Sequence, residues 1–238
     1  MTLIKDETET LNFISKVLKP LIDDEVYITL LCARKKYCPT ISSSEEVLSR
    51  EIIRNNDPLK IIRKLKKISI VEDIYTDKSN NVIPSSAMAL YILLDPRSTI
   101  KAYGDFIKST NDWMSEHLRN SNTMLECDLS LYRRLDIKLF SAIHKNRSRP
   151  IYFIIDIDNK DKCILEDILL HDEILPHIKW ISETHGGYHI ILERNDVTGN
   201  YIHHLHLNPN KFIEILKEPM TPLPGSLQGD FLVKEVKI

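Results

Sequence analysis

Two aspartates, Asp156 and Asp158, stand at the end of an apolar run that begins at residue 151. The run is rich in isoleucine and aromatic residues and is too short for a helix, so it predicts a buried strand. Because side chains alternate along a strand, the two carboxylates leave it on the same face. Carboxylates this close repel each other, and a divalent cation relieves the repulsion. Oxygen ligands suit Mg²⁺ or Mn²⁺, so the pair predicts a metal site.

A second candidate segment is Thr184-His-Gly186-Gly187-Tyr-His189, which leads into an apolar run at residues 190–192. Two consecutive glycines can adopt backbone angles closed to other residues and let a phosphate approach the main chain. His189 then opens a predicted strand at residues 188–192, where its ring can donate a hydrogen bond to an anion. Together with the two aspartates, this segment predicts a site for a nucleoside triphosphate.

In this order, the two segments resemble the first two motifs of the archaeo-eukaryotic primase superfamily. That family includes replicative primase small subunits, primase-polymerases and the polymerase domains of bacterial end-joining ligases. The resemblance covers about the last third of the chain. It implies that Asp156 and Asp158 hold catalytic metals and that His189 contacts the phosphates of the incoming nucleotide. The nucleotide-binding residues implied beside His189 are Thr184, Gly186 and Gly187.

The later motifs of the family match this chain less completely. Residues 224–226, Pro-Gly-Ser, resemble a turn near the end of the family's catalytic core, which makes Ser226 a further nucleotide-binding candidate. The family's third metal-binding acid typically lies on a strand before that turn, where this chain has only Asp196, Glu214 and Glu218. None of these ends a clear apolar strand. Either Asp230, in a strand-like segment after the turn, is the third catalytic acid, or the third ligand is missing.

The remaining apolar patterns predict the elements around this site. Helices are expected at residues 10–21, 42–54, 58–68, 100–118, 129–144 and 161–177, and strands at 26–32, 87–94 and 178–182. The strand, helix, strand and adjacent strand after residue 149 fit an α/β (α+β) core sheet of the ferredoxin-like or RNA-recognition-motif type, as in primase-polymerases. We expect residues 149–238 to form this core and residues 1–148 to form an N-terminal α/β part of the same catalytic unit.

Composition limits the class of protein. The 238 residues are 42% hydrophobic and 28% charged, which is ordinary for a globular protein. The net charge is −2, so any basic surface that binds nucleic acid must be confined to one part of the protein. No apolar run approaches the length that spans a membrane, and the N-terminus lacks a signal-peptide pattern. We expect an intracellular protein without a membrane partner. The four cysteines have no paired metal spacing and are expected to be free thiols.

Basic residues provide candidate nucleic-acid contacts. Arg34 and Lys35 belong to a basic cluster at the end of the strand predicted at residues 26–32, and the alternative is a solvated strand end. Arg97 precedes a helix with hydroxyl residues beside it, which suits either an anion site or a plain capped turn. The helix at residues 58–68 has a basic face, which fits a nucleic-acid contact or simple solvation.

A histidine cluster offers a competing site. His204 and His206, separated by one apolar residue, would share one face of a strand, as in the metal pair of rolling-circle relaxases and Rep endonucleases. Those enzymes use a tyrosine on a following helix, and none occurs at residues 211–217. The alternative is an exposed histidine-rich loop or strand.

The motifs therefore predict a template-dependent nucleotidyltransferase of the DNA primase or primase-polymerase type that uses two divalent metals. Its substrates would be nucleoside triphosphates and a single-stranded or primed nucleic acid, with a replication protein as a further partner. An alternative is a catalytically degenerate primase-like protein that binds nucleotide or nucleic acid, and a metal-dependent nuclease is a third. Loss of the third acid favours the degenerate protein.

Overall fold

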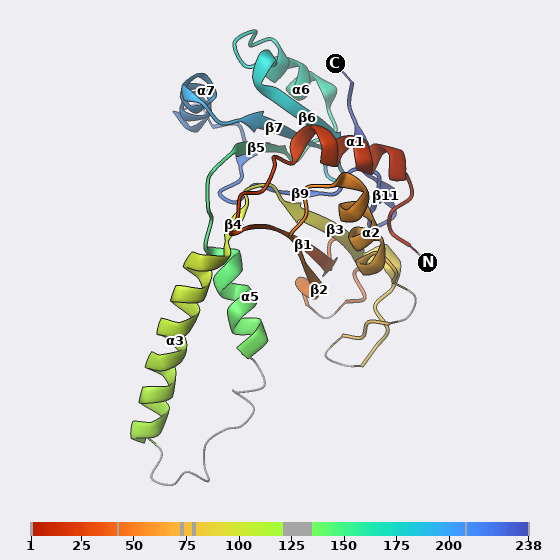
Figure 1. The fold of residues 1–238 in the computed structure, drawn as a ribbon. Coiled ribbons are helices and arrows are strands. Elements are labelled where there is room, and N and C mark those ends of the chain that lie inside the picture. The colour runs from red at the N-terminus through yellow and green to blue at the C-terminus, as the bar shows by residue number, and fades with distance from the viewer. Residues whose placement is uncertain are drawn as a thin grey trace.

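The computed structural model describes residues 2–41, 43–71, 74–77, 80–120, 135–207 and 209–237. It is a mixed α/β structure built on two antiparallel sheets, one above the other in Figure 1. The first sheet has the central order β11-β10-β3-β1-β2, with β4 paired to β1 and β9 paired to β3. Its strands are β1 (Glu25–Arg34), β2 (Glu45–Ile53), β3 (Met88–Leu93), β4 (Arg97–Ser98), β9 (Met220–Pro222), β10 (Leu227–Gln228) and β11 (Phe231–Leu232).

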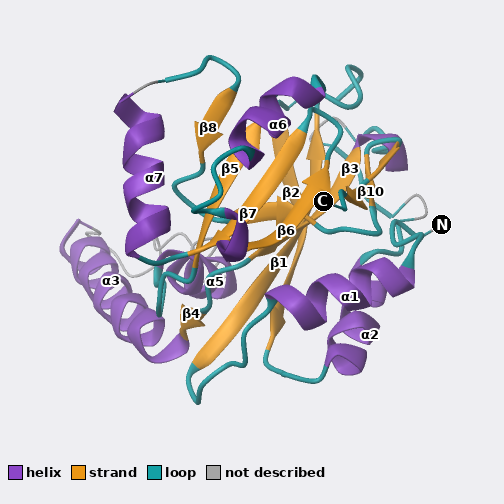
Figure 2. Cartoon of the chain, turned by 90° about the horizontal axis from the view of Figure 1, so that it is seen from above, coloured by secondary structure: helices purple, strands orange, loops and turns teal. Residues whose placement is uncertain are grey.

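Two pairs of helices lie on opposite sides of the first sheet (Figure 2). Helices α1 (Glu7–Val17) and α2 (Pro58–Ile68) pack on one face, and α3 (Thr99–Asn120) and α5 (Leu135–Lys145) pack on the other. Helix α2 has the bounds expected from the sequence, because Asp57 accepts a hydrogen bond from the Leu59 amide and Pro58 stands at its first position. A short 3₁₀ helix, η1 (Ser85–Ala87), leads into β3.

The second sheet has the order β12-β6-β7-β5-β8. Along the chain, its elements are β5 (Tyr152–Ile157), α6 (Lys162–Leu169), the 3₁₀ helix η3 (Leu175–His177), β6 (Ile178–Glu183), β7 (Tyr188–Glu193), α7 (Asp196–Leu207), β8 (Ile213–Ile215) and β12 (Lys234–Glu235). The outer face packs its isoleucines against α6 and α7. The inner face joins the core of the first sheet, where Phe13 of α1 makes an edge-on contact with Trp180 of β6 at 5.3 Å.

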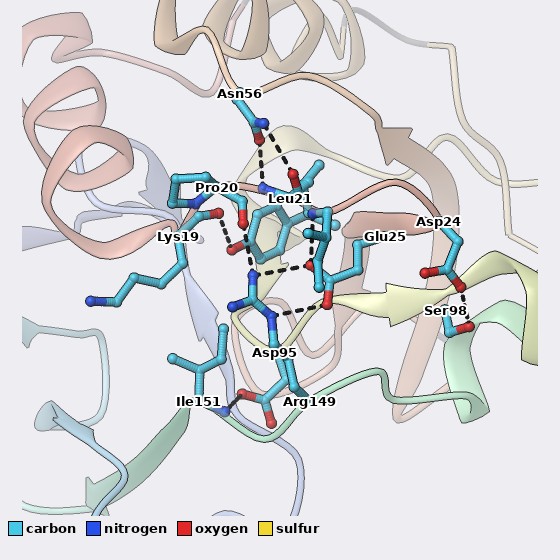
Figure 3. Close-up of polar contacts among 12 residues, drawn as sticks. Lys19, Pro20, Leu21, Asp24, Glu25, Asn56, Asp95, Ser98, Arg149 and Ile151 are labelled. Carbon is cyan, nitrogen blue, oxygen red and sulfur yellow. Dashed lines mark hydrogen bonds and ion pairs between the residues drawn. The ribbon is translucent and has the colours of Figure 1, made fainter.

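Buried polar contacts also tie the two sheets together. Asp95, which follows β3 and is fully buried, accepts a hydrogen bond from the Ile151 amide at 2.8 Å and pairs with Arg147 at 3.2 Å. Arg149 pairs with the buried Glu25 at the start of β1 at 2.9 Å (Figure 3). The basic linker before β5 is therefore structural and lies at the strand end opposite Asp156.

A further ion-pair cluster ties the second sheet to the segment after α1 and is centred on Glu193 at the end of β7. Its carboxylate pairs with Lys19 at 2.9 Å and with Lys179 at 2.6 Å. Hydrogen bonds from Lys179 and then Lys19 lower the pKa of Glu193 to about 2.

Several expected elements differ in the structure. The helix expected at residues 42–54 is wrong: residues 45–53 form β2, an edge strand paired with β1. The helix expected at 161–177 ends at Leu169, and the paired histidines His204 and His206 lie on α7, so they do not share a strand face. Part of the helix expected at 129–144 lies outside the described residues. Strands β9, β10 and β11, from the C-terminal part, join the first sheet.

Among the described residues, no helix combines the length and the apolar character that crossing a bilayer requires.

Candidate nucleotide and metal site

A row of polar residues crosses the inner face of the second sheet. Asp156 in β5 stands opposite His189 in β7 on one side and Glu214 in β8 on the other. Alternation along the strands puts Asp156 on the same face as Ile154, and His189 on the same face as Ile191, toward the first sheet. The pairing of the three strands therefore places two carboxylates and an imidazole side by side.

His189 is held by groups from both sheets. Its Nε2 lies 3.1 Å from Asp156 Oδ1, and its Nδ1 lies 3.1 Å from the Thr221 hydroxyl of β9. Only 8% of the residue is exposed, so the ring cannot turn freely. When Nε2 carries the proton, it donates to Asp156, and the same proton can be donated to another anion that reaches this position.

The glycine turn packs directly on the segment that carries the acids. The Gly187 amide donates to the Thr184 hydroxyl at 3.2 Å, and the Thr184 amide donates to the Gly187 carbonyl at 2.8 Å. A Cβ atom on Gly187 would lie 1.9 Å from the Ile157 carbonyl oxygen, and one on Gly186 would lie 2.9 Å from Asp158 Oδ1. Glycine is therefore required here so that the turn can approach the backbone beyond β5.

These residues line one cavity of about 280 Å³ where the two sheets meet. Three carboxylates line its wall: Asp156 of β5, Asp158 just after β5 and Glu214 of β8. Two cations also line it, Arg34 at the end of β1 and Lys36 in the turn that follows. The remaining lining residues are Tyr91, Thr184, Gly186, His189, Leu216, Met220 and Gln228. A cavity with acids on one side and cations on the other suits a metal ion bound to a phosphate chain.

The two cations are positioned in different ways. Arg34 ends β1, pairs with Glu45 at 3.0 Å and donates to the Tyr91 hydroxyl at 3.2 Å. Lys36 follows two residues later. Burial and the Arg34 guanidinium lower the pKa of Lys36 below its ordinary value, whereas the carboxylates of Asp158 and Asp156 act in the opposite direction. Lys36 thus lies within electrostatic reach of the acidic pair.

A hydrogen-bonded chain connects the first sheet to the glycine turn. The hydroxyls of Tyr91 and Tyr37 are 2.8 Å apart, and the Gln228 side-chain amide donates to Tyr37 at 2.8 Å. The Gln228 carbonyl oxygen in turn accepts from the His185 amide at 2.8 Å. This chain fixes the position of the turn relative to β1 and β3, and hence the width of the cavity.

A second cavity of about 330 Å³ adjoins the first, because Met220 lines both. Its apolar lining includes Val47 and Phe140, and the Arg50 guanidinium lies 5.2 Å from the centroid of the Phe140 ring. The second cavity thus combines apolar and aromatic side chains with charged ones, which include Arg50, Glu45 and Glu218.

Five residues named from the sequence lie outside the cavity lining: Gly187, which packs on the Ile157 carbonyl beside the acids, and four others. Lys35 is exposed, and Asp230 occupies the turn between β10 and β11. Ser226 is fully buried and its hydroxyl donates to the Leu223 carbonyl at 2.7 Å. Arg97 is 2% exposed and pairs with Glu218. None of the four is brought to Asp156 by the fold.

Two charged lining residues, Lys36 and Glu214, are not among the candidates from the sequence. Lys36 belongs to the same basic cluster as Arg34 but lies in the turn after β1, where strand alternation does not apply, so no local signal separates it from Lys35. Glu214 lies between two isoleucines in Ile-Glu-Ile, an alternation typical of a strand. That strand is only three residues long, and its pairing with Asp156 depends on the folded sheet.

The donor set fits a hard divalent cation. Magnesium bound with a nucleotide takes one or two carboxylates from the protein, and phosphate oxygens and water supply the other ligands. Asp156 and Asp158 meet that requirement, with Glu214 across the strand pairing. In the part of the chain that the structure describes, no three His, Cys, Asp or Glu side chains are already arranged to hold a metal.

In comparisons with known proteins, no protein-family model, no curated protein and no solved structure matches this chain. The interpretation of the site rests on its own residues and geometry.

Proposed function

We propose that the protein is a template-dependent nucleotidyltransferase of the primase-polymerase type. One observation supports this most directly: carboxylates, cations and a constrained histidine from two sheets line a single cavity. The second sheet adds support. Its strand, helix, strand, strand, helix, strand order is that of the ferredoxin-like or RNA-recognition-type core expected for this family.

Each lining residue has a role in this proposal. Asp156 and Asp158 would hold the divalent ions, Mg²⁺ or Mn²⁺, with Glu214 as the third carboxylate. When bound, the metals neutralise phosphate charge and activate the 3′-hydroxyl of the growing strand. His189 donates a hydrogen bond to a phosphate oxygen, and the Gly187 turn sets its position.

The cations act on the same phosphate chain. Arg34 and Lys36 face the carboxylates across the cavity and bind the phosphate oxygens. A triphosphate favours the protonated form of Lys36, which is the form that binds phosphate oxygens. The adjoining cavity, with Phe140 and Arg50, is where a base and the template strand would lie.

The test is incorporation of labelled nucleotide with Mn²⁺ on primed and unprimed single strands. We expect extension by the wild type and a loss of about a hundredfold or more in Asp156→Asn and Asp158→Asn, because each removes a charge that the reaction needs. Asp167→Asn, an exposed change on α6, is the matched control and should retain full activity. Extension that survives in Asp156→Asn refutes the proposal.

A second candidate function follows from the direct contact between His189 and Asp156. That contact engages one oxygen of the first acid and leaves fewer oxygens for two metals, which would suit a protein that binds nucleotide or nucleic acid without catalysis. Binding without extension would support this candidate. Shortened strands would instead identify a metal-dependent nuclease.

A further inference from the structure

Helix α2 has a strongly basic outer face. Lys60 lies three and four residues before Arg63 and Lys64, and Lys67 lies four and three residues after them, which places the four along one side of the helix. The opposite side is buried through Ile61, Ile62, Leu65 and Ile68. No acidic residue occurs in the helix.

A fifth cation completes a concave surface. Arg54, just beyond the end of β2, meets the helix so that a hollow of about 360 Å³ forms between them. The lining consists of Ile53, Arg54, Asn55, Lys60, Ile61, Arg63, Lys64 and Lys67, and it contains no carboxylate. We call the five cations of this lining the α2 basic face.

Most of this charge is not neutralised by the protein. Lys64 pairs with Glu51 at 2.7 Å. The structure shows no ion pair from Arg54, Lys60, Arg63 or Lys67 to any described residue. The four-residue spacings within the set place like charges next to each other, an arrangement that destabilises a helix unless an anion lies between them.

The dimensions fit a phosphate backbone. From Lys60 to Lys67 the helix rises about 10 Å, which equals the rise of about three nucleotides in a duplex strand. Contacts between Lys or Arg and phosphates are the general source of affinity for nucleic acid and are independent of sequence. A row of unneutralised cations of this length therefore suits a polyphosphate backbone better than a single small anion.

We propose that the α2 basic face binds the phosphate backbone of a nucleic-acid strand. It is a separate site from the cavity at Asp156. Ile53 pairs with Tyr27 near one end of β1, whereas Arg34 ends the other, about 20 Å away along the strand. Helix α2 also lies on the face of the first sheet opposite α3 and α5 (Figure 2). The proposal goes beyond nucleotide transfer and does not depend on it.

The test measures binding of a fluorescein-labelled 20-nucleotide single-stranded DNA by anisotropy, with EDTA present so that no chemistry occurs. The variant carries Lys60→Gln, Arg63→Gln and Lys67→Gln; all three positions are exposed, and glutamine is a good helix former. The control carries Lys101→Gln, Lys108→Gln and Arg119→Gln on α3, with the same change of net charge. Thermal melts verify that both remain folded.

We expect the α2 variant to bind at least about tenfold more weakly at 0.1 M salt. Its slope of log affinity against log salt should fall by about 0.7 for each phosphate that the variant no longer neutralises, or about 2 for the three substitutions together. The control should bind within twofold of the wild type. Equal losses of affinity in both variants, unchanged binding by the α2 variant, or no binding by the wild type would each overturn the proposal.

One further arm separates the alternatives. Binding to phosphatidylserine vesicles without binding to DNA would assign the face to an anionic membrane surface and overturn the proposal. The DNA-binding measurement contains EDTA and no nucleotide, so its outcome does not depend on whether the wild type incorporates nucleotide. Failure of the proposed enzyme activity would therefore leave this inference standing.

Discussion

Replacing Gly187 with alanine should destabilise the protein and displace its acidic segment. The added Cβ would lie 1.9 Å from the Ile157 carbonyl oxygen and 2.6 Å from the Asn159 carbonyl oxygen. Both contacts are with backbone atoms, so no side chain can turn aside, and the turn must move by more than an ångström. Overpacking of this kind costs about 3 kcal/mol, the upper part of its usual range.

Urea denaturation measures this effect, and Gly199→Ala is the matched control. Gly199 lies in α7 with nothing within 4 Å of its added Cβ. Alanine is the better helix former, so this variant should be more stable than the wild type by about 0.5–1 kcal/mol. The same substitution should therefore lower the free energy of unfolding at Gly187 and raise it at Gly199.

Gly186→Ala provides an intermediate case. Its added Cβ would meet a side-chain oxygen, Asp158 Oδ1, at 2.9 Å. Because that carboxylate can rotate, we expect a smaller loss of stability than at Gly187, with a loss of metal-dependent nucleotide binding. A Gly187→Ala protein as stable as the wild type would refute the close packing between the turn and the acidic segment.

Three further predictions concern single carboxylates. Because its folded-state pKa is lowered to about 2, Glu193 stabilises the fold above about pH 4.5, and this contribution is lost as the pH falls toward 2. Glu193→Gln should thus lower the free energy of unfolding by about 1 kcal/mol at pH 7 and by less at pH 3. An equal loss of stability at the two pH values would contradict this role of Glu193. Asp95→Ala leaves Arg147 and the Ile151 amide unpaired, so urea denaturation should show a loss of about 3 kcal/mol; a loss below about 1 kcal/mol would argue against the link. Glu214→Gln should reduce nucleotide incorporation more than Asp230→Asn does, and the reverse order would restore Asp230 as the third acid.

Local patterns in the sequence predicted the elements that local chemistry determines. Helix α2 is delimited by Asp57 and Pro58 and by its apolar spacing, so its bounds were predicted correctly. The buried runs of β1 and β3 were also predicted, because continuous apolar segments of that length favour strands. Strand β2 was misread as a helix, since its serines and paired acids imitate a helix start and its exposed edge lacks a clear alternation.

The same distinction applies to the candidate site. Asp156 and His189 each stand in a recognisable local motif, and strand pairing brings them together as direct neighbours. Arg34 and Lys36 reach the cavity from the first sheet, more than a hundred residues earlier in the chain. Glu214 depends on the register of a three-residue strand with β5. These last three positions follow from tertiary packing, which no local pattern encodes.

The most direct test of the central claim is calorimetric binding of a nucleoside triphosphate in the presence of Mn²⁺ and then in EDTA. We predict binding that requires Mn²⁺ and that is weakened at least about tenfold by Asp156→Asn and by Asp158→Asn, while Asp167→Asn binds as the wild type does. Binding of equal strength in EDTA, or in the Asp156→Asn protein, would contradict a metal–nucleotide site between the two sheets.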